Sequence, residues 1–530
     1  MDNLSSHGNP ASSINQQSDG DNPAISAECG SAESSDGTGL VGKMDDLHLQ
    51  NPTRGLDLSD DLHPGDKLLA VASSLGVEVE DAAFAEYMDQ HDSLRRLRQV
   101  FHYPKMKNLP TVDLRLVDPE EDCVYFGGSS MGLCAHSVKQ HMDGMLRQWA
   151  TIGSQGYERG DTPFFHCDVA VARDMAKHVG AKEVEVAIMN GLTVNLHLQL
   201  VSFYNPTPTR HKILCESGAF HADMFAFQSQ IRFHGYDPEK SLICLGPREG
   251  DHTLRTEDIL QKIEEEGDSI AVICFPGVQY YTGQLFDIPT ITAAGQKKGC
   301  YVGWDVSHAA GNVELLLHDW NVDFACWCTY KYFNGGPGNV AGFFLHERHK
   351  DSYQKMPRFL GQWGCRFSSW FDPEYQADVS PGAYGYRLTI PPGLLFAPLK
   401  ASMEVFQQTS MKDLAAKSRL LTGYLELLVS RKYQKQPGGK TENKGDNQSC
   451  VEFLTPHDPK QRGASLSLKL HKDVLEKVYT EISKRGVVCE KWPPHVIRMA
   501  PAPMYCSFQD IHRFMKYFTQ AMEAATASAH

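Results

Sequence analysis

The first forty residues contain no lysine or arginine, although nine of them are serine. A secretory signal needs a basic stretch before its apolar segment, and a mitochondrial targeting segment needs arginines along one helix face. The start of the chain matches neither kind of signal. Its polar composition is typical of disorder, and we expect a disordered tail over residues 1–60.

Long hydrophobic runs are also missing. No apolar stretch reaches the roughly 18 to 20 residues that cross a bilayer. We therefore expect no membrane partner and a cytoplasmic location for the chain.

An excess of positive charge is absent as well. The chain carries 51 Lys and Arg against 65 Asp and Glu, a formal net charge of −14. Such a balance disfavours binding to a phosphate backbone, so no nucleic-acid partner is expected. The 14 cysteines include no C-x-x-C pair, and we interpret them as buried, reduced thiols. No metal site is predicted.

What remains is the composition of a globular protein. The 530 residues are 41% hydrophobic and 22% charged, enough for a large core and more than one compact unit. Short apolar runs alternate with longer amphipathic segments, which predicts an α/β architecture with a mostly parallel sheet. The predicted strands are 184–190, 211–217, 270–275, 300–306 and 323–330. Helices are predicted at 193–204 and 255–267, and a polar surface loop at 432–449.

Polar residues follow four of these strands. In open α/β sheets, ligands bind beyond the carboxyl ends of the strands. Thr193 follows the first predicted strand, Asp223 the second, Asp305 and His308 the fourth, and Lys331 the fifth. Taken singly, the first four have structural alternatives: helix caps for Thr193 and Asp223, a turn residue for Asp305, and a structural role for His308. Together they offer a helix N-terminus, two carboxylates, an imidazole and an amine to one crevice.

Lys331 is the hardest of these residues to explain by structure alone. It stands among Tyr330, Tyr332 and Phe333, where a buried charge is costly. Desolvation favours the neutral amine, the form that reacts with an aldehyde. A pyridoxal phosphate site combines such a lysine with a carboxylate for the ring nitrogen, an aromatic or imidazole face, and a helix N-terminus for the phosphate. We therefore predict that Lys331 anchors pyridoxal phosphate, with Asp305 at the ring nitrogen.

Longer motifs resemble one enzyme family. The chain resembles kynureninases, from about Asp61 to the C-terminus, in the stretches NGLTVNLHLQLVSFYNPTPTRHKIL, GVQYYTGQLFDIP, GCYVGWDVSHAAGNVELLLHDWNVDFACWCTYKYFNGGPG and VIRMAPAPMYCSF. The resemblance implies an α/β pyridoxal phosphate enzyme of fold type I. It would have a mostly parallel central sheet in a large domain, residues 126–399, and a smaller α+β domain formed by residues 61–125 and 400–530.

The same resemblance implies an activity and an assembly. The expected reaction is hydrolysis of the Cβ–Cγ bond of L-kynurenine or 3-hydroxykynurenine, which yields alanine and an anthranilate-type acid. That reaction belongs to tryptophan catabolism and NAD biosynthesis. The substrate is then a small amino acid, and the expected assembly is a homodimer with its active sites at the subunit interface.

The resemblance also implies roles for residues. Lys331 would bond the cofactor, Asp305 would pair with the pyridine nitrogen, and His308 would lie close to the cofactor. Tyr330 would contact the phosphate and relay protons. Arg498, in VIRMAPAP, would hold the substrate α-carboxylate through two parallel hydrogen bonds.

The remaining cofactor contacts are implied in the same way. Leu192 and Thr193 begin the expected phosphate-binding helix, Phe220 matches the aromatic residue that stacks on the ring, and Asp223 matches a second ring contact. Gln362 stands where the family has the first tryptophan of GWWGH or GWFGH. Its amide can still donate a hydrogen bond on the phosphate side.

Two further departures fall in the family's aryl-recognition region. Tyr157 replaces a histidine and Ile390 replaces an asparagine, so a substrate ring hydroxyl loses polar partners there. Two alternatives to a kynureninase stay open: a related enzyme for another γ-keto amino acid, and a non-catalytic protein that binds pyridoxal phosphate. The retained Tyr330 and Arg498 argue against the second.

Overall fold

The computed structural model describes residues 62–352, 355–370, 377–434 and 451–527. All of them fall in one compact unit, Asn51–His530. The tail predicted over residues 1–60, and all but the start of the loop predicted at 432–449, lie outside the described residues. No helix in the described part of the chain is long and apolar enough to cross a membrane.

The described residues form a seven-stranded main sheet in the order β2-β8-β7-β6-β5-β3-β4. Its strands are β2 Val186–Met189, β3 Lys212–Glu216, β4 Leu242–Leu245, β5 Ile270–Pro276, β6 Tyr301–Asp305, β7 Phe324–Trp327 and β8 Ala341–Leu345. Neighbours from β7 to β4 are parallel, whereas β8 is antiparallel to both β7 and β2. The mostly parallel sheet and its five predicted strands are confirmed; β4 and β8 are additional.

Alternating side chains of the main sheet enter two separate cores. Cys215 belongs to the core that includes α6 and α7, whereas its neighbour Leu214 belongs to the core that includes α5, α9 and α10. The helices around the sheet are α4 Val138–Ile152, α5 Val169–His178, α6 Leu192–Phe203, α7 His221–Phe233, α8 Pro238–Ser241, α9 Thr256–Glu266, α10 Ile288–Lys297 and α11 Gly393–Phe406. The predicted helices at 193–204 and 255–267 are therefore confirmed as α6 and α9. A sheet covered on both faces explains why its strands are continuous apolar runs.

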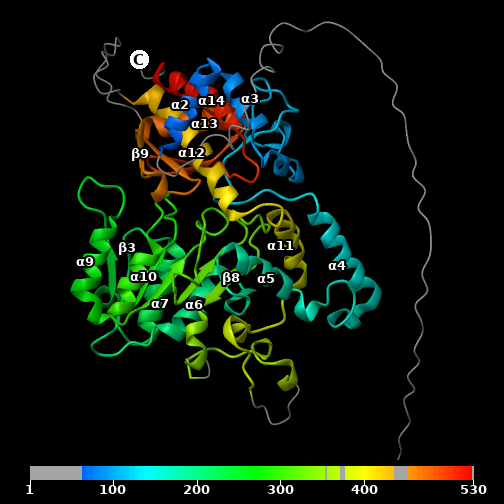
Figure 1. The fold of residues 1–530 in the computed structure, drawn as a ribbon, viewed down its shortest axis with the longest axis vertical. Coiled ribbons are helices and arrows are strands. Elements are labelled where there is room, and N and C mark those ends of the chain that lie inside the picture. The colour runs from blue at the N-terminus through cyan, green and yellow to red at the C-terminus, as the bar shows by residue number, and fades with distance from the viewer. Residues whose placement is uncertain (1–61, 353–354, 371–376, 435–450, 528–530) are drawn as a thin grey trace, which may run out of the picture. The chain divides into compact units, whose positions relative to one another are not determined.

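A second group of elements joins the two ends of the described chain. Its strands are β1 Val124–Tyr125, β9 Val451–Phe453, β10 Leu466–Leu470, β11 Val487–Val488, β12 Glu490–Trp492 and β13 Val496–Met499. Its helices are α2 Pro64–Leu75, α3 Ala82–Gln90, α12 Met411–Tyr433, α13 Lys472–Lys484 and α14 Phe508–Ala527. In Figure 1 the blue α2 and α3 lie beside the yellow-to-red α12 and α14, and these helices are in contact. The predicted division into a large and a small domain stays a prediction.

Short 3-10 helices complete the described secondary structure. They are Arg95–Val100, Met106–Asn108, Gly153–Tyr157, Phe164–His166, Glu183–Glu185, Gly267–Ser269, Glu347–Ser352, Gln362–Gly364, Phe367–Ser369, Gly382–Tyr386 and Pro459–Gln461. Several of them connect elements of the main sheet to the segments that carry predicted site residues.

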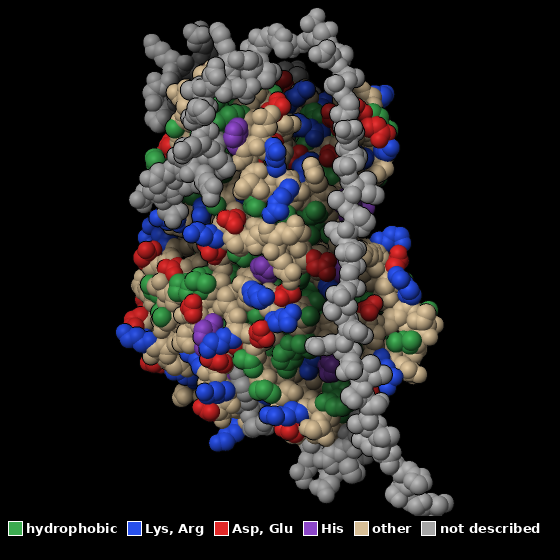
Figure 2. All heavy atoms as spheres, turned by 45° about the vertical axis from the view of Figure 1, so that its right-hand side comes forward, with side chains coloured by type: hydrophobic (Ala, Val, Ile, Leu, Met, Phe, Trp, Pro, Cys, Tyr) green, Lys and Arg blue, Asp and Glu red, His purple; other side chains and the backbone are tan. Residues whose placement is uncertain are grey.

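Charges of both signs are interspersed on the face drawn in Figure 2, where blue and red side chains lie among one another. Exposed pairs such as Lys107–Glu120, 2.7 Å apart, are of this kind. Exposed pairs contribute little to stability because water screens them. The polar contacts that matter for the fold are therefore the buried ones.

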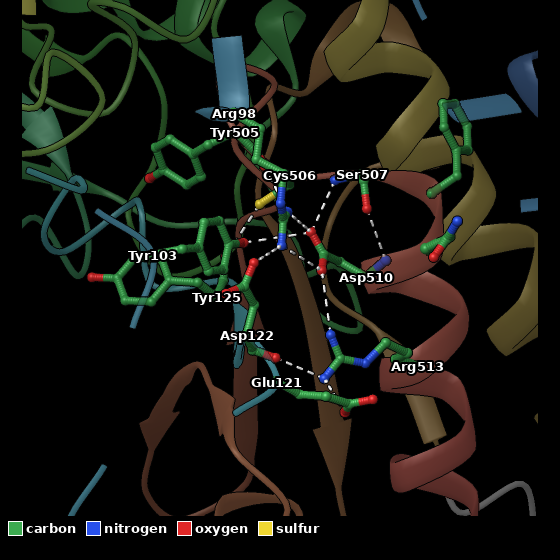
Figure 3. A network of polar contacts seen from close by, with 12 residues as sticks. Arg98, Tyr103, Glu121, Asp122, Tyr125, Tyr505, Cys506, Ser507, Asp510 and Arg513 are labelled. Carbon is green, nitrogen blue, oxygen red and sulfur yellow. Dashed lines mark hydrogen bonds and ion pairs between the residues drawn. The ribbon is translucent and has the colours of Figure 1, made fainter. Parts of the chain in front are cut away.

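Arg98 is the centre of a polar network between the two ends of the described chain, in which Asp510 is the buried partner (Figure 3). Its guanidinium donates to Asp510 of α14 at 2.5 Å and to the carbonyl of Tyr505 at 2.8 Å, and it lies over the ring of Tyr103 at 3.8 Å. Burial lowers the pKa of Arg98, but the charge of Asp510, the neighbouring Tyr103 and the hydrogen bond to Asp510 together raise it overall. The network holds Tyr505, whose hydroxyl would lie 2.5 Å from a Cβ at Gly128.

Asp510→Asn should lower the free energy of unfolding by about 1.5 to 3 kcal/mol, because it removes the buried carboxylate to which Arg98 donates and leaves that guanidinium only the more exposed Asp122, 3.4 Å away. Chemical denaturation followed by circular dichroism measures the change. Asp143→Asn is the matched control, since Asp143 forms an exposed pair with Lys139, and it should leave the unfolding midpoint unchanged. Equal effects of the two substitutions would contradict a structural role for Arg98.

Candidate active site

The carboxyl ends of β2, β3, β6 and β7 bring most of the predicted site residues to one edge of the main sheet. Lys331 lies in the loop after β7, and its side chain is only 9% exposed. Its Nζ lies 2.9 Å from Nε2 of His308, which follows β6. Burial, and then the charge of Lys331, lower the pKa of His308 well below its usual value. The neutral form of His308 is therefore favoured beside the lysine Nζ.

Two carboxyl groups lie beside this pair. Asp305 ends β6, and its Oδ1 accepts a hydrogen bond from the backbone N–H of Ser307 at 2.8 Å. Asp223 lies in the first turn of α7 and is buried. Burial, then the charge of Asp305 and a hydrogen bond to it, raise the pKa of Asp223, while Lys331 opposes that rise. The protonated form of Asp223 is therefore favoured beside Asp305.

An aromatic ring and a helix N-terminus border the same place. The ring centroid of Phe220 lies 5.9 Å from Nζ of Lys331. Helix α6 begins at Leu192 after Gly191, and no side chain caps it. The capping alternative for Thr193 is therefore wrong, and the first N–H groups of α6 are left to bind an anion. Asp223 likewise makes no capping hydrogen bond for α7.

Tyr330 lies next to Lys331 and is held by its neighbours. Its hydroxyl accepts a hydrogen bond from Sγ of Cys328 at 3.2 Å, and its carbonyl accepts one from the N–H of Gly132 at 2.9 Å. Burial raises the pKa of the Tyr330 phenol. A Cβ at Gly132 would lie 2.5 Å from the carbonyl oxygen of Lys331, so this close approach of two segments requires glycine.

Arg498 reaches the site from β13 and is 3% exposed. Its guanidinium donates to Glu490 and to the carbonyl of Tyr280, while its Nε has no partner among the described residues. Glu490 also accepts from Ser129 Oγ at 3.1 Å and from Trp492 Nε1 at 3.1 Å. Glu490 therefore fixes the orientation of Arg498.

Two of the positions that depart from the family pattern form a separate group. Tyr157 and Ile390 line one cavity of about 490 Å³, together with Trp149 and Phe164. Neither Lys331 nor any residue described above as its neighbour lines this cavity. The predicted site residues thus include a lysine group and an aryl group, Tyr157 and Ile390. Gln362 belongs to neither group: it lies on an exposed turn, where its amide donates to the carbonyl of Trp370 at 3.1 Å.

Sequence reasoning missed Glu490 and Glu216. Glu490 stands eight residues before Arg498 and is its register partner across the antiparallel β12 and β13. This pairing could be predicted from the sequence only if both strands were recognised first. Glu216 is buried at the end of β3, one of the positions where the site was expected. A carboxylate ending an apolar strand was a usable signal for it.

Comparisons with known proteins agree with this geometry. The kynureninase C-terminal domain family matches residues 414–518. The kynureninase of Nematostella vectensis is 48% identical over 466 residues, covering 88% of this chain and 99% of that protein. The kynureninase of Homo sapiens is 46% identical over 465 residues, covering 87% and 97%.

Solved structures resemble the fold at low sequence identity. A cysteine desulfurase from Thermococcus onnurineus NA1 has a TM-score of 0.59 and 12% identity, covering 76% of this chain and 95% of that one. A C-DES mutant with glycine covalently linked to its PLP cofactor has a TM-score of 0.60 and 13% identity, covering 77% and 99%. These likenesses confirm the predicted fold type I architecture. With relatives this similar over nearly their whole length, the chain belongs to the kynureninase family.

Proposed function

We propose that this protein is a pyridoxal phosphate-dependent hydrolase that cleaves the Cβ–Cγ bond of L-kynurenine or 3-hydroxykynurenine and releases alanine and an anthranilate-type acid, in tryptophan catabolism. The observation that carries the proposal is a set of buried polar atoms around Lys331. Asp223 Oδ1, His308 Nδ1 and Arg498 Nε have no hydrogen-bond partner among the described residues. Buried polar atoms are rarely left unpaired, so polar groups of a bound ligand fit here.

The residues present fit pyridoxal phosphate. Lys331 can bond the aldehyde, Asp305 can hold the ring nitrogen protonated, and Phe220 offers an aromatic face. The N-terminus of α6 at Leu192 and Thr193 suits the phosphate, and Tyr330 lies beside Lys331. The bound cofactor supplies an electron sink for negative charge at the substrate α-carbon.

The protein side of the reaction follows from the same groups. Arg498 binds the substrate α-carboxylate, and Glu490 keeps its guanidinium in place. Lys331, next to a neutral His308, takes up and returns the proton of the α-carbon. Tyr330 is the hydroxyl donor for the later proton transfer, since its raised pKa keeps it protonated.

We also propose a homodimer in which the aryl cavity of one copy completes the lysine group of the other. Large apolar side chains are exposed beside that cavity: Leu146 is 42% exposed, Trp149 62% and Leu394 39%. Exposed apolar side chains of this size are typical of an interface. Sedimentation equilibrium tests the assembly, and a monomer at active concentrations would contradict it.

A cytoplasmic location and a two-domain organisation belong to the same proposal. The twelve described cysteines are free thiols, the state that the cytosol maintains. The second sheet, β12-β13-β10-β9, is distinct from the main sheet, which supports a smaller domain built from residues 61–125 and 400–530 beside a large one over residues 126–399.

Borohydride reduction of the holo-protein should fix the cofactor on Lys331, because the buried amine lies against the ring face of Phe220 and a neutral His308. Peptide mass mapping locates the label, and the Lys331→Ala protein should carry none. A label on another lysine would overturn the site.

Arg498→Lys should raise KM and lower kcat/KM by about one to two decades, because an ammonium cannot make two parallel bonds to a carboxylate. Steady-state kinetics with kynurenine measures both values. Arg513→Lys is the matched control: Arg513 pairs with Glu121, away from the site, and its kinetics should match the wild type. An unchanged KM for Arg498→Lys would remove Arg498 from the substrate site.

The aryl group should set the substrate preference. A ring hydroxyl that meets Ile390 and Tyr157 is desolvated without a matched partner, so the wild type should prefer kynurenine to 3-hydroxykynurenine. The double change Ile390→Asn with Tyr157→His should shift the ratio of kcat/KM values toward the hydroxylated substrate by roughly one decade. Both substrates compete in one vessel, and each single change is measured too. A wild-type preference for 3-hydroxykynurenine would contradict this placement.

Glu216 gives the site a pH-dependent effect on stability. Burial raises its pKa from 4.5 to about 8, a hydrogen bond from Gln279 opposes the rise, and the charge of Asp305 adds to it. The folded state therefore binds this proton more tightly than the unfolded state does. The protonated Glu216 therefore contributes its full stability to the fold below pH 4.5. That contribution is lost as the pH rises through about 8.

Glu216→Gln should remove this pH dependence. The Tm of the variant minus that of the wild type should grow as the pH rises from 4.5 to about 8, measured by differential scanning calorimetry. Glu239→Gln, on the short helix α8, is the control and should show no such growth. A Tm difference that does not vary with pH would show that Glu216 is ionised in the folded protein.

A further inference from the structure

Cys215 and Cys244 lie opposite each other on neighbouring parallel strands. They are register partners in β3 and β4, and their Sγ atoms are 3.8 Å apart. Paired residues of adjacent strands have Cα atoms within the range that a disulfide bridges. The two sulfurs therefore need only a side-chain adjustment to bond.

The two thiols differ in access. Cys244 is exposed on β4, the edge strand of the main sheet, whereas Cys215 is buried beside Ala226 and Phe227 of α7. The prediction that the cysteines are buried is thus wrong for Cys244, and also for Cys134. An oxidant in solution reaches Cys244 first.

The two thiols also differ in acidity. A hydrogen bond from Cys215 lowers the pKa of Cys244 to about 7, and the same bond, with burial, raises that of Cys215. Burial raises the pKa of the exposed Cys134. Among the described cysteines, Cys244 is the one whose pKa is lowered. Since the thiolate is the nucleophile, Cys244 is the reactive member and Cys215 the resolving one.

We propose that Cys215 and Cys244 form a modification site that hydrogen peroxide converts into a disulfide. The Cys244 thiolate attacks one peroxide oxygen, the O–O bond breaks, and hydroxide leaves from a new sulfenic acid. The sulfur of Cys215 then attacks that sulfenic sulfur, the S–O bond breaks, and the hydroxide takes the Cys215 proton as water. Two thiols lose two electrons in total, and peroxide is reduced to two waters.

The position connects this site to the active-site edge of the sheet. Glu216 directly follows Cys215 in β3, and the chain then leads to Phe220 and the start of α7. The disulfide would covalently join β3 to the edge strand at this point. Cytosolic disulfides of this kind are transient and sense oxidants rather than stabilise folds.

The test treats reduced holo-protein with stoichiometric hydrogen peroxide and then blocks free thiols. We expect an intact mass lower by two hydrogen atoms, a cross-linked peptide pair containing Cys215 and Cys244, and reversal by dithiothreitol. Cys244→Ser should abolish the cross-link and slow peroxide consumption roughly tenfold. Cys134→Ser, the matched control at the other exposed thiol, should change neither.

A second measurement tests directly whether the two thiols are adjacent. Phenylarsine oxide bridges two adjacent thiols, so one equivalent should protect both Cys215 and Cys244 of the wild type from iodoacetamide added after denaturation, and should leave Cys215 unprotected in Cys244→Ser. Cross-linking of Cys244 to a different cysteine, faster oxidation of Cys134, or a sulfinic acid at Cys244 with Cys215 still free would each overturn the proposal.

Discussion

Parallel strands end at the same edge of a sheet, and this constraint organises the candidate site. The strands from β7 to β4 run in one direction, so the loops after β3, β6 and β7 must meet. Those loops bring an amine, an imidazole and two carboxyl groups into an interior where each charge would be costly alone. The cost is limited because burial favours the neutral forms of His308 and Asp223.

The same constraint explains what could be predicted from sequence. Asp305 ends a strand, and His308 and Lys331 follow strands within a few residues, so their convergence follows from strand order alone. The helix α6 was predicted from 193, one residue after its start at Leu192, because a strand and a glycine precede a helical pattern. These inferences required only local patterns and the geometry of parallel sheets.

Other features depend on contacts that local patterns do not encode. Glu490 and Ser129 meet although 361 positions separate them in the chain, so no window of sequence contains both. The strand β4 has only four residues and shows no clear alternation of polar and apolar side chains. Because this edge strand was not predicted, the exposure of Cys244 was not predicted either. The resemblance placed Tyr157 and Ile390 at the substrate ring, but it could not place them relative to Lys331 within one chain.

The antiparallel strand β8 has a consequence for dynamics. It begins where the lysine loop ends, and it pairs with β7 on one side and β2 on the other. The loop that carries Lys331 is therefore tied at both ends to ladders in the middle of a buried sheet. Backbone amides of β7 and β8 that donate within these ladders can exchange their hydrogens with solvent only when a ladder inside the sheet opens. The lysine consequently sits in the part of the molecule that should open last, close to global unfolding.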